Sequence, residues 1–210
     1  DCLLSRGLGD VYKRQVSYYA SFLRYDRIVI EQWCNYTKQT YRNRCHIAGA
    51  NGLLALSVPI VKPDTIKCPT KDIRISDHGE WRHLHWNAIA SAYGSSPFFE
   101  YYQDDIRPFF EKRYEFLLDF NEEIRRTVCN LIGIEPHIEY SSSYSEPAPG
   151  ETDLRDVIHP KRRKAETILP VQLKPYYQVF SEKYGFQPDL SIIDLLMNMG
   201  PESILILQNT

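Results

Sequence analysis

Residues Asn35–Val61, NYTKQTYRNRCHIAGANGLLALSVPIV, join a polar, cationic run to the clearest turn signal of the chain. Asn51 and Gly52 stand between two apolar runs, and both residue types tolerate the positive φ that a tight hairpin turn requires. The pattern therefore predicts a β-hairpin with strands near residues 43–48 and 53–60.

The strand that precedes this turn carries two arginines and a histidine. If residues 42–47 are extended, the side chains of Arg42, Arg44 and His46 point to one face, because side chains alternate along a strand. Guanidinium groups in such a row lie in solvent, pair with carboxylates, or bind an anionic ligand through paired hydrogen bonds. Arg42 and Arg44 are therefore our first candidates for contact with an anionic small molecule.

Composition bounds the class of protein. The 210 residues fit one domain, and 43% hydrophobic residues supply an ample core. A net charge of -2 gives no reason to expect nucleic acid or an anionic membrane surface as a partner. Five scattered cysteines, an odd number, argue against a disulfide framework and against structural zinc. No apolar run approaches the roughly 20 residues of a membrane helix. We expect a soluble cytoplasmic protein without a metal or a cofactor.

The first fifteen residues do not read as part of a natural fold. They contain no initiator methionine and no apolar signal segment, and residues 5–15, SRGLGDVYKRQ, resemble the translation of a transposon-based sequencing adapter. A short basic lead-in helix is the alternative. We expect residues 1–15 to pack poorly, and the native domain to cover residues 16–210 without its N-terminal strand.

Half of an α/β crossover is predicted directly after this segment. VSYYASFLRYD, residues 16–26, has the apolar spacing of a helix, and RIVIEQW, residues 27–33, reads as a short buried strand. Glu31 lies at the carboxyl end of that strand, where open α/β sheets bind ligands. A pairing with a nearby arginine explains Glu31 equally well. Tyr18 and Tyr19, on the preceding helix, are candidates to flank a ligand.

The second half of the chain is expected to be rich in helices. WRHLHWNAIASAY, residues 81–93, is apolar nearly all round, so burial on more than one side is expected, and Asp77 is the acid expected to cap this helix. A longer helical region over residues 98–132 divides into two or three segments. Residues 134–172 read as a loop-rich insertion and residues 173–210 as a C-terminal helical part, with its first helix expected over residues 176–184. A half-buried strand is expected over residues 71–76, KDIRIS. The predicted fold class is α/β: a small mixed sheet with a hairpin, packed by a helix-rich second half.

Three histidines are candidate general bases, because imidazole titrates near neutral pH. His83 and His85 are two residues apart on a predicted helix and point to different faces, so a shared metal ion is not expected. His83 and Asn87 share a face at a spacing of four residues. His46, on the predicted hairpin, is the third candidate.

Two polar residues interrupt the apolar C-terminal helix that Ser191 is expected to cap. Asp194 and Asn198 share one face of this helix. Such pairs usually cap buried backbone or bind a buried cation, and Arg42 or Arg44 is the candidate partner.

Several standard motifs are absent from the sequence. The chain has neither a Walker motif nor G-x-G-x-x-G, so it lacks both standard phosphate cradles. It also has no H-E-x-x-H and no G-x-S-x-G. A nucleotide would therefore have to be bound by other groups.

Four blocks of sequence together resemble the WbqC-like protein family: YTKQTYRNRCHIAGANG with LLALSVPIV, WRHLHWNAIASAYGSSPFFEYY, DFNEEI, and YYQVF…GFQPDLSIIDLLMNMGPES. The resemblance covers almost everything from Val16 to Leu207. The family is known from O-antigen and related surface-polysaccharide gene clusters, with a suggestion that members transfer an amino acid onto a sugar. Its members usually begin with a strand and a Q-P-x-Y-x-P loop, and this chain departs from that pattern.

The resemblance implies a transferase that acts on a nucleotide-linked sugar or another anionic small molecule. Arg42 and Arg44 would bind the anionic part of this ligand, with help from Lys38. Other polar candidates would orient hydroxyl or amide groups: Asn43, Asn51 and Gln39. The alternative is a non-catalytic scaffold that binds a sugar or a partner protein. Arginines that converge with a histidine on a concave site would favour the enzyme, and arginines neutralised in a dry core would favour a structural role.

Overall fold

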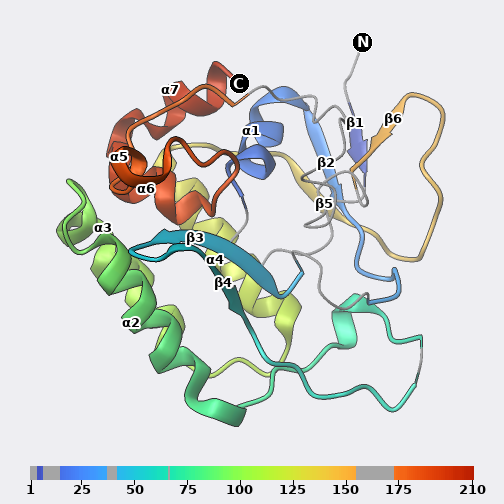
Figure 1. The fold of residues 1–210 in the computed structure, drawn as a ribbon. Coiled ribbons are helices and arrows are strands. Elements are labelled where there is room, and N and C mark those ends of the chain that lie inside the picture. Colours follow the sequence, from blue (N-terminus) through green and yellow to red (C-terminus); the bar gives the residue numbers. More distant parts are fainter. Residues whose placement is uncertain (1–3, 7–14, 37–41, 66, 155–172) are drawn as a thin grey trace.

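Four short parallel strands form the main sheet of the described part of the chain (Figure 1). The computed structural model describes residues 4–6, 15–36, 42–65, 67–154 and 173–210. The strand order is β5-β2-β1-β6, with β1 at Leu4–Arg6, β2 at Arg27–Ile30, β5 at Ile138–Tyr140 and β6 at Glu151–Asp153. Because all the pairings are parallel, the carboxyl ends of the strands meet at one edge of the sheet.

The crossover predicted from the sequence is present. Helix α1, Val16–Arg24, precedes β2 and buries every residue of its first two turns. Its aromatic side chains belong to the core, where the rings of Tyr18 and Phe22 meet edge to face with 4.4 Å between their centroids. β2 buries its last three residues, as expected of an inner strand of a parallel sheet.

The predicted hairpin is also present. Strands β3, Arg44–Gly49, and β4, Gly52–Ser57, pair antiparallel around the predicted turn. Gly52 adopts a φ of 100°, which a residue with a side chain rarely adopts, so the Asn-Gly signal was read correctly. The hairpin forms a two-stranded sheet of its own, and β3 contacts both α2 and α6.

The second half is rich in helices, as the sequence predicted. In chain order these are η1 Thr70–Asp72, η2 His78–Glu80, α2 Trp81–Tyr93, α3 Phe99–Ile106, η3 Arg107–Phe110, α4 Leu117–Ile132, α5 Ser181–Tyr184, α6 Ile192–Met199, η5 Gly200–Glu202 and α7 Ser203–Gln208. The fold class is therefore α/β. Among the residues described, no helix combines the length and apolar character needed to cross a bilayer.

The segment from residue 71 to residue 76 is not the strand that its alternating pattern predicted. It begins inside η1, and afterwards Arg74 and Ile75 make only single bridges, to Phe116 and Ile60 respectively. The segment therefore divides its backbone pairing between two different neighbours, one on each side. The alternation reflects this half-buried position without a regular strand.

Helix α2 has the predicted bounds but is buried along one side only. Leu84 is 59% exposed, so the expectation of burial on more than one side is wrong. The acid expected to cap the helix also acts differently. Asp77 makes an ion pair with Arg82 at 2.7 Å, and the N-cap position carries no side-chain hydrogen bond.

Three strands of the main sheet lie where none was predicted. β5 and β6 fall within the region that we expected to be a loop-rich insertion, and β1 falls within residues 1–15. β1 pairs with both β2 and β6, so Leu4–Arg6 occupies the place in the sheet where we expected a strand to be missing. The remaining residues of that first segment, except Gln15, lie outside the described part.

The C-terminal part folds around the apolar helix α6. Asp194 accepts hydrogen bonds from the Tyr176 hydroxyl at 2.7 Å and from the Gln178 amide at 3.0 Å. The expectation that Arg42 or Arg44 would be its partner is therefore wrong, because these neutral donors surround the carboxylate. They also draw the chain away from helical geometry, so only Ser181–Tyr184 of the helix expected over residues 176–184 forms.

Ser191 joins three parts of the fold. Its hydroxyl accepts a hydrogen bond from the backbone N–H of Ile193, which confirms it as the N-cap of α6. Its own N–H donates to the backbone carbonyl of His46 on β3 at 2.8 Å. It also forms a β-bridge with Gln15, the residue before α1.

Candidate functional site

Glu31 lies at the carboxyl end of β2 with 0% of its surface exposed. Its Oε1 accepts hydrogen bonds from the Trp33 backbone N–H at 2.7 Å and from the Ser141 hydroxyl at 2.9 Å. Its Oε2 is buried and has no hydrogen-bond partner among the described residues. A buried carboxylate oxygen without a partner is costly, which points to a group that completes the site when bound.

Ser141 directly follows β5, the neighbour of β2, so the two residues meet at the edge where parallel sheets bind ligands. Its hydroxyl accepts from the Gln32 backbone N–H at 3.1 Å, which directs the hydroxyl proton to Glu31. Its carbonyl accepts from the Gln32 amide at 2.7 Å and from the Trp33 indole at 3.0 Å. These contacts hold the Glu31 carboxylate in one orientation.

A buried ion pair on α4 borders this site. Arg125 donates from Nε to Glu122 Oε2 at 2.9 Å, and the Tyr140 hydroxyl donates to the same oxygen at 2.6 Å. Burial alone would lower the pKa of Arg125, but the Glu122 carboxylate raises it further, so the net shift is upward. Burial and the same carboxylate raise the pKa of Tyr140. Glu122 Oε1 is a second buried carboxylate oxygen for which the described part of the chain offers no hydrogen-bond partner.

Arg42 does not share a strand face with Arg44, because β3 begins only at Arg44. Its buried guanidinium donates to the Asn35 carbonyl at 2.7 Å and contacts Cys34 Sγ at 3.4 Å. Its own carbonyl accepts from the Asn121 amide on α4 at 3.3 Å. These contacts fix the backbone near residue 35 against α4, which is a structural role.

These contacts, together with the peptide links Asn121–Glu122 and Tyr140–Ser141, connect a group of residues that we call the polar ring: Glu31, Cys34, Arg42, Asn121, Glu122, Arg125, Tyr140 and Ser141. Sequence reasoning identified only Glu31 and Arg42 among them. Ser141 is 110 positions from Glu31, so no local pattern joins the two. The one available signal was the DFNEEI block, which places Asn121 and Glu122 side by side at the start of a helix.

The polar candidates on the hairpin mainly bind its own backbone and side chains. Arg44 donates from Nε to the Ser57 hydroxyl at 2.8 Å, across the strand pair. Asn43 donates to the Val58 carbonyl at 2.9 Å. Asn51 is exposed in the turn. Arg44 is partly exposed and retains terminal nitrogens without a partner in the described structure.

His83 is exposed on α2 and lies 2.9 Å from the Asn87 amide, as their spacing predicted. It lines an open cavity of about 480 Å³ together with Arg82, Trp86 and Arg107. An aromatic floor beside cations suits a polar ligand, but this cavity is built from α2 and η3, and Glu31 is not among its lining residues.

His85 and His46 lie in other environments. His85 is buried, with its ring edge-on to Trp81 at 5.2 Å, so it faces the opposite way from His83, as predicted. His46 is partly exposed on β3, and its backbone carbonyl accepts from Ser191. The three candidate bases are therefore not assembled on one face.

Tyr18 and Tyr19 are buried in the core beside Phe22, so they are not placed to flank a ligand as we expected. Lys38 and Gln39 lie outside the described residues. Across the described ranges, no three His, Cys, Asp or Glu side chains gather in a way that could hold a metal ion.

Comparison with known proteins identifies relatives but no activity. The model of the WbqC-like protein family matches residues 15–169, more than half of the chain. The chain is also 26% identical over 200 residues to the uncharacterized protein Rv1507c of Mycobacterium tuberculosis, covering 85% of this chain and 86% of that protein. No solved structure is a match.

Proposed function

Because this chain belongs to the WbqC-like protein family, we propose that it is a cytoplasmic transferase of surface-polysaccharide biosynthesis that moves an acyl or aminoacyl group onto a nucleotide-linked sugar. The observation that carries the proposal is the carboxylate of Glu31. It is buried at the carboxyl edge of the sheet, where open α/β sheets bind ligands, with one oxygen held and the other without a hydrogen-bond partner among the described residues.

Glu31 would act as the general base. Acyl transfer needs a hydroxyl or amine of the sugar to attack the donor carbonyl, while a base removes its proton. The Trp33 N–H and the Ser141 hydroxyl occupy Oε1, which leaves Oε2 to accept that proton. The new bond to the acyl carbon forms as the bond to the donor's leaving group breaks. A carboxylate held in advance loses little free energy to reorientation.

The anionic part of the nucleotide would be bound by Lys or Arg side chains whose nitrogens are not all engaged in hydrogen bonds within the fold. Arg44 is the described candidate, since only its Nε takes part in a hydrogen bond with a described residue. Lys38, which lies outside the described residues, would assist. Arg42 is assigned to structure, because its guanidinium is buried against Asn35 and Cys34.

A non-catalytic scaffold is the second candidate function. The observation in its favour is that Arg42, and the buried Glu122–Arg125 pair, stabilise the fold through internal contacts. A polar site of this kind can recognise a sugar without converting it. Binding and turnover must therefore be measured separately.

The first test compares Glu31→Gln with Glu139→Gln, a partly exposed glutamate on neighbouring β5 that pairs with Arg27. Binding of uridine-, guanosine- and thymidine-diphosphate sugars is measured by calorimetry, and acylated products are then sought by mass spectrometry with a panel of acyl and aminoacyl thioesters. We expect Glu31→Gln to bind the sugar nearly as wild type does but to form product about 100-fold more slowly or less. Glu139→Gln should match wild type.

Each alternative outcome has a distinct meaning. Binding without product in the wild-type protein would favour the scaffold. Equal turnover by both variants would remove Glu31 from the mechanism. Absence of binding to every nucleotide sugar would overturn the proposed substrate class.

A further inference from the structure

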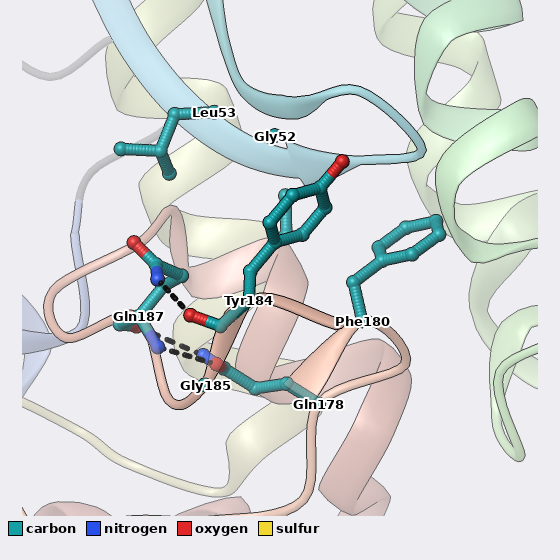
Figure 2. Close-up of a pocket in the computed structure, with 8 residues that line it drawn as sticks. Gly52, Leu53, Gln178, Phe180, Tyr184, Gly185 and Gln187 are labelled. Atoms are coloured by element: carbon teal, nitrogen blue, oxygen red, sulfur yellow. Dashed lines mark hydrogen bonds between the residues drawn. The ribbon is translucent and has the colours of Figure 1, made fainter. Parts of the chain in front are cut away.

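A small, partly enclosed cavity lies between the hairpin and the segment that contains α5 (Figure 2). Its volume is about 130 Å³. The residues that line it come from two sequence regions far apart in the chain: Ala48, Gly52, Leu53, Gln178, Phe180, Tyr184, Gly185 and Gln187. None of these side chains is charged.

Hydrogen bonds fix the wall formed by Gln178. Its Oε1 accepts from the Gln187 backbone N–H at 2.9 Å, and its Nε2 donates to the Gln187 carbonyl and to buried Asp194 Oδ2, each at 3.0 Å. Figure 2 shows the first two of these contacts joining the ends of the loop that carries Phe180 and Tyr184. The wall is therefore formed before any ligand enters.

A second set of bonds fixes the opposite side of the cavity to the hairpin. The Tyr184 hydroxyl and the Lys183 ammonium group both donate to the Ala50 carbonyl, at 2.8 and 2.9 Å. This carbonyl lies in the hairpin turn, so the turn and the loop are held at a constant separation. Because the cavity exists before binding, less of the ligand's binding free energy is lost to ordering the protein.

The amide of Gln187 is the polar group available to a ligand. Its Nε2 donates one hydrogen bond, to the Tyr184 carbonyl at 2.9 Å, while its Oε1 accepts none from the described residues. The Gln187 side chain thus keeps its Oε1 acceptor and one Nε2 N–H available for a ligand. Ala48, Leu53 and Phe180 offer only apolar contact.

Size and charge narrow the class of ligand further. A cavity of about 150 Å³ holds a benzene molecule, so this one holds about five or six non-hydrogen atoms. A charged group would lose hydration with no opposite charge on the walls to replace it.

We propose that this cavity binds a small uncharged group that combines apolar carbons with a single amide, a short acyl amide. The apolar carbons pack against Phe180 and Leu53, and the amide exchanges hydrogen bonds with Gln187. The site shares no residue with the polar ring, so its ligand is independent of the proposed transferase activity.

The probe is N-methylacetamide, titrated into the full chain while the backbone amides of Gly52 and Gly185 and the Gln187 side-chain amide are followed by NMR. Acetate, of similar size but charged, and benzene, which has no amide, are titrated in parallel. We expect saturable shifts of these signals with N-methylacetamide at millimolar concentrations, and at least about tenfold weaker binding of acetate and benzene.

Two neighbouring leucines provide matched variants. Leu53 and Leu54 are both exposed on β4, at 48% and 42%, but only Leu53 lines the cavity. Leu53→Trp should block the mouth of the cavity and weaken binding at least tenfold, while Leu54→Trp should leave it unchanged. Gln187→Leu, which keeps the size but removes the amide, should weaken binding to a similar degree.

Three results would overturn the assignment. The absence of a saturable shift with N-methylacetamide up to about 100 mM, roughly the weakest affinity expected for so small a ligand, would refute binding at this cavity. Equal binding of acetate or benzene would refute recognition of an uncharged amide. Equal loss of binding in both tryptophan variants would place the ligand elsewhere.

Discussion

Asp194 is a carboxylic acid enclosed within the core, with 0% of its surface exposed. Burial raises its pKa from 3.8 to about 6, although the hydrogen bonds from Tyr176 and Gln178 and the nearby Tyr93 hydroxyl act in the opposite direction. Because no cation stands among these neighbours, the carboxylate is stabilised only by neutral donors. The residue therefore titrates within the range in which cellular proteins operate.

Stability should depend on pH through this residue. The folded-state pKa of about 6 exceeds the unfolded value of 3.8, so protonation favours the folded state; this contribution is complete below about pH 4 and is lost as the pH rises through 6. The loss amounts to about 3 kcal/mol at most. Asp194→Asn should remove this dependence, so urea unfolding between pH 4.5 and 8 should give a flatter profile than wild type.

Asp104→Asn, which changes an exposed aspartate, serves as the control and should retain the wild-type profile. An Asp194→Asn protein as sensitive to pH as wild type would show that another group causes the dependence.

At the scale of elements, the junction between α6 and η5 depends on one glycine. Gly200 stands there with a φ of 55°, and a Cβ at this position would lie 2.5 Å from the Phe98 ring. The backbone of Phe98 in turn donates to the Met197 carbonyl at 3.0 Å, so the ring cannot move away freely. Both the backbone conformation and the contact require glycine.

Gly200→Ala should therefore lower the free energy of unfolding by about 2–4 kcal/mol, from backbone strain and overpacking together. Gly133→Ala provides the matched control: Gly133 ends α4 with a φ of 78°, but no atom lies within 4 Å of the added Cβ. Its loss should be about 1 kcal/mol, from the backbone alone. Equal losses in chemical denaturation would mean that the Phe98 contact has no effect.

At the scale of the whole molecule, β1 occupies the inner position of the main sheet, between β2 and β6. The pairing spans Leu4–Arg6 on both sides. If residues 1–15 derive from an adapter, these three residues supply backbone hydrogen bonds that do not depend on side-chain identity. A parallel sheet without this strand would expose the inner edges of β2 and β6.

Removal of residues 1–14 tests whether this strand contributes to the fold. We expect the loss of its ladder hydrogen bonds to cost about 3 kcal/mol and to lower the thermal midpoint by roughly 6–12 °C. Removal of residues 209–210, which belong to no sheet, should change the midpoint little. An unchanged midpoint after the first truncation would mean that residues 1–14 add nothing to stability, as sequence reasoning expected.

Local signals predicted the elements that local interactions specify. The turn at Gly52 and the bounds of α2 follow from backbone preference and periodicity, and both were predicted closely. The helix expected from Tyr176 failed because Gln178 bonds to Gln187 and to Asp194, contacts that no helical pattern contains. Periodicity could not reveal them.

The candidate site was predicted only where one element defines it. Glu31 could be placed at a strand end, but its partner Ser141 belongs to a strand with little sequence signal of its own. Arg42 was assigned to a ligand because residues 42 and 43 were predicted to belong to the strand that begins only at Arg44. The Arg42 guanidinium instead donates to the Asn35 carbonyl inside the fold. Contacts between residues far apart in the sequence decide which charged side chains are paired inside the fold.

The three-way junction at Ser191 also has a kinetic consequence. Through this residue the start of α1, the middle of β3 and the first turn of α6 share backbone hydrogen bonds that are buried from water. None of these segments can open to solvent without breaking a bond that also belongs to another. We therefore expect the three segments to open as one cooperative unit, so that hydrogen exchange of their amide protons should report one common free energy of opening.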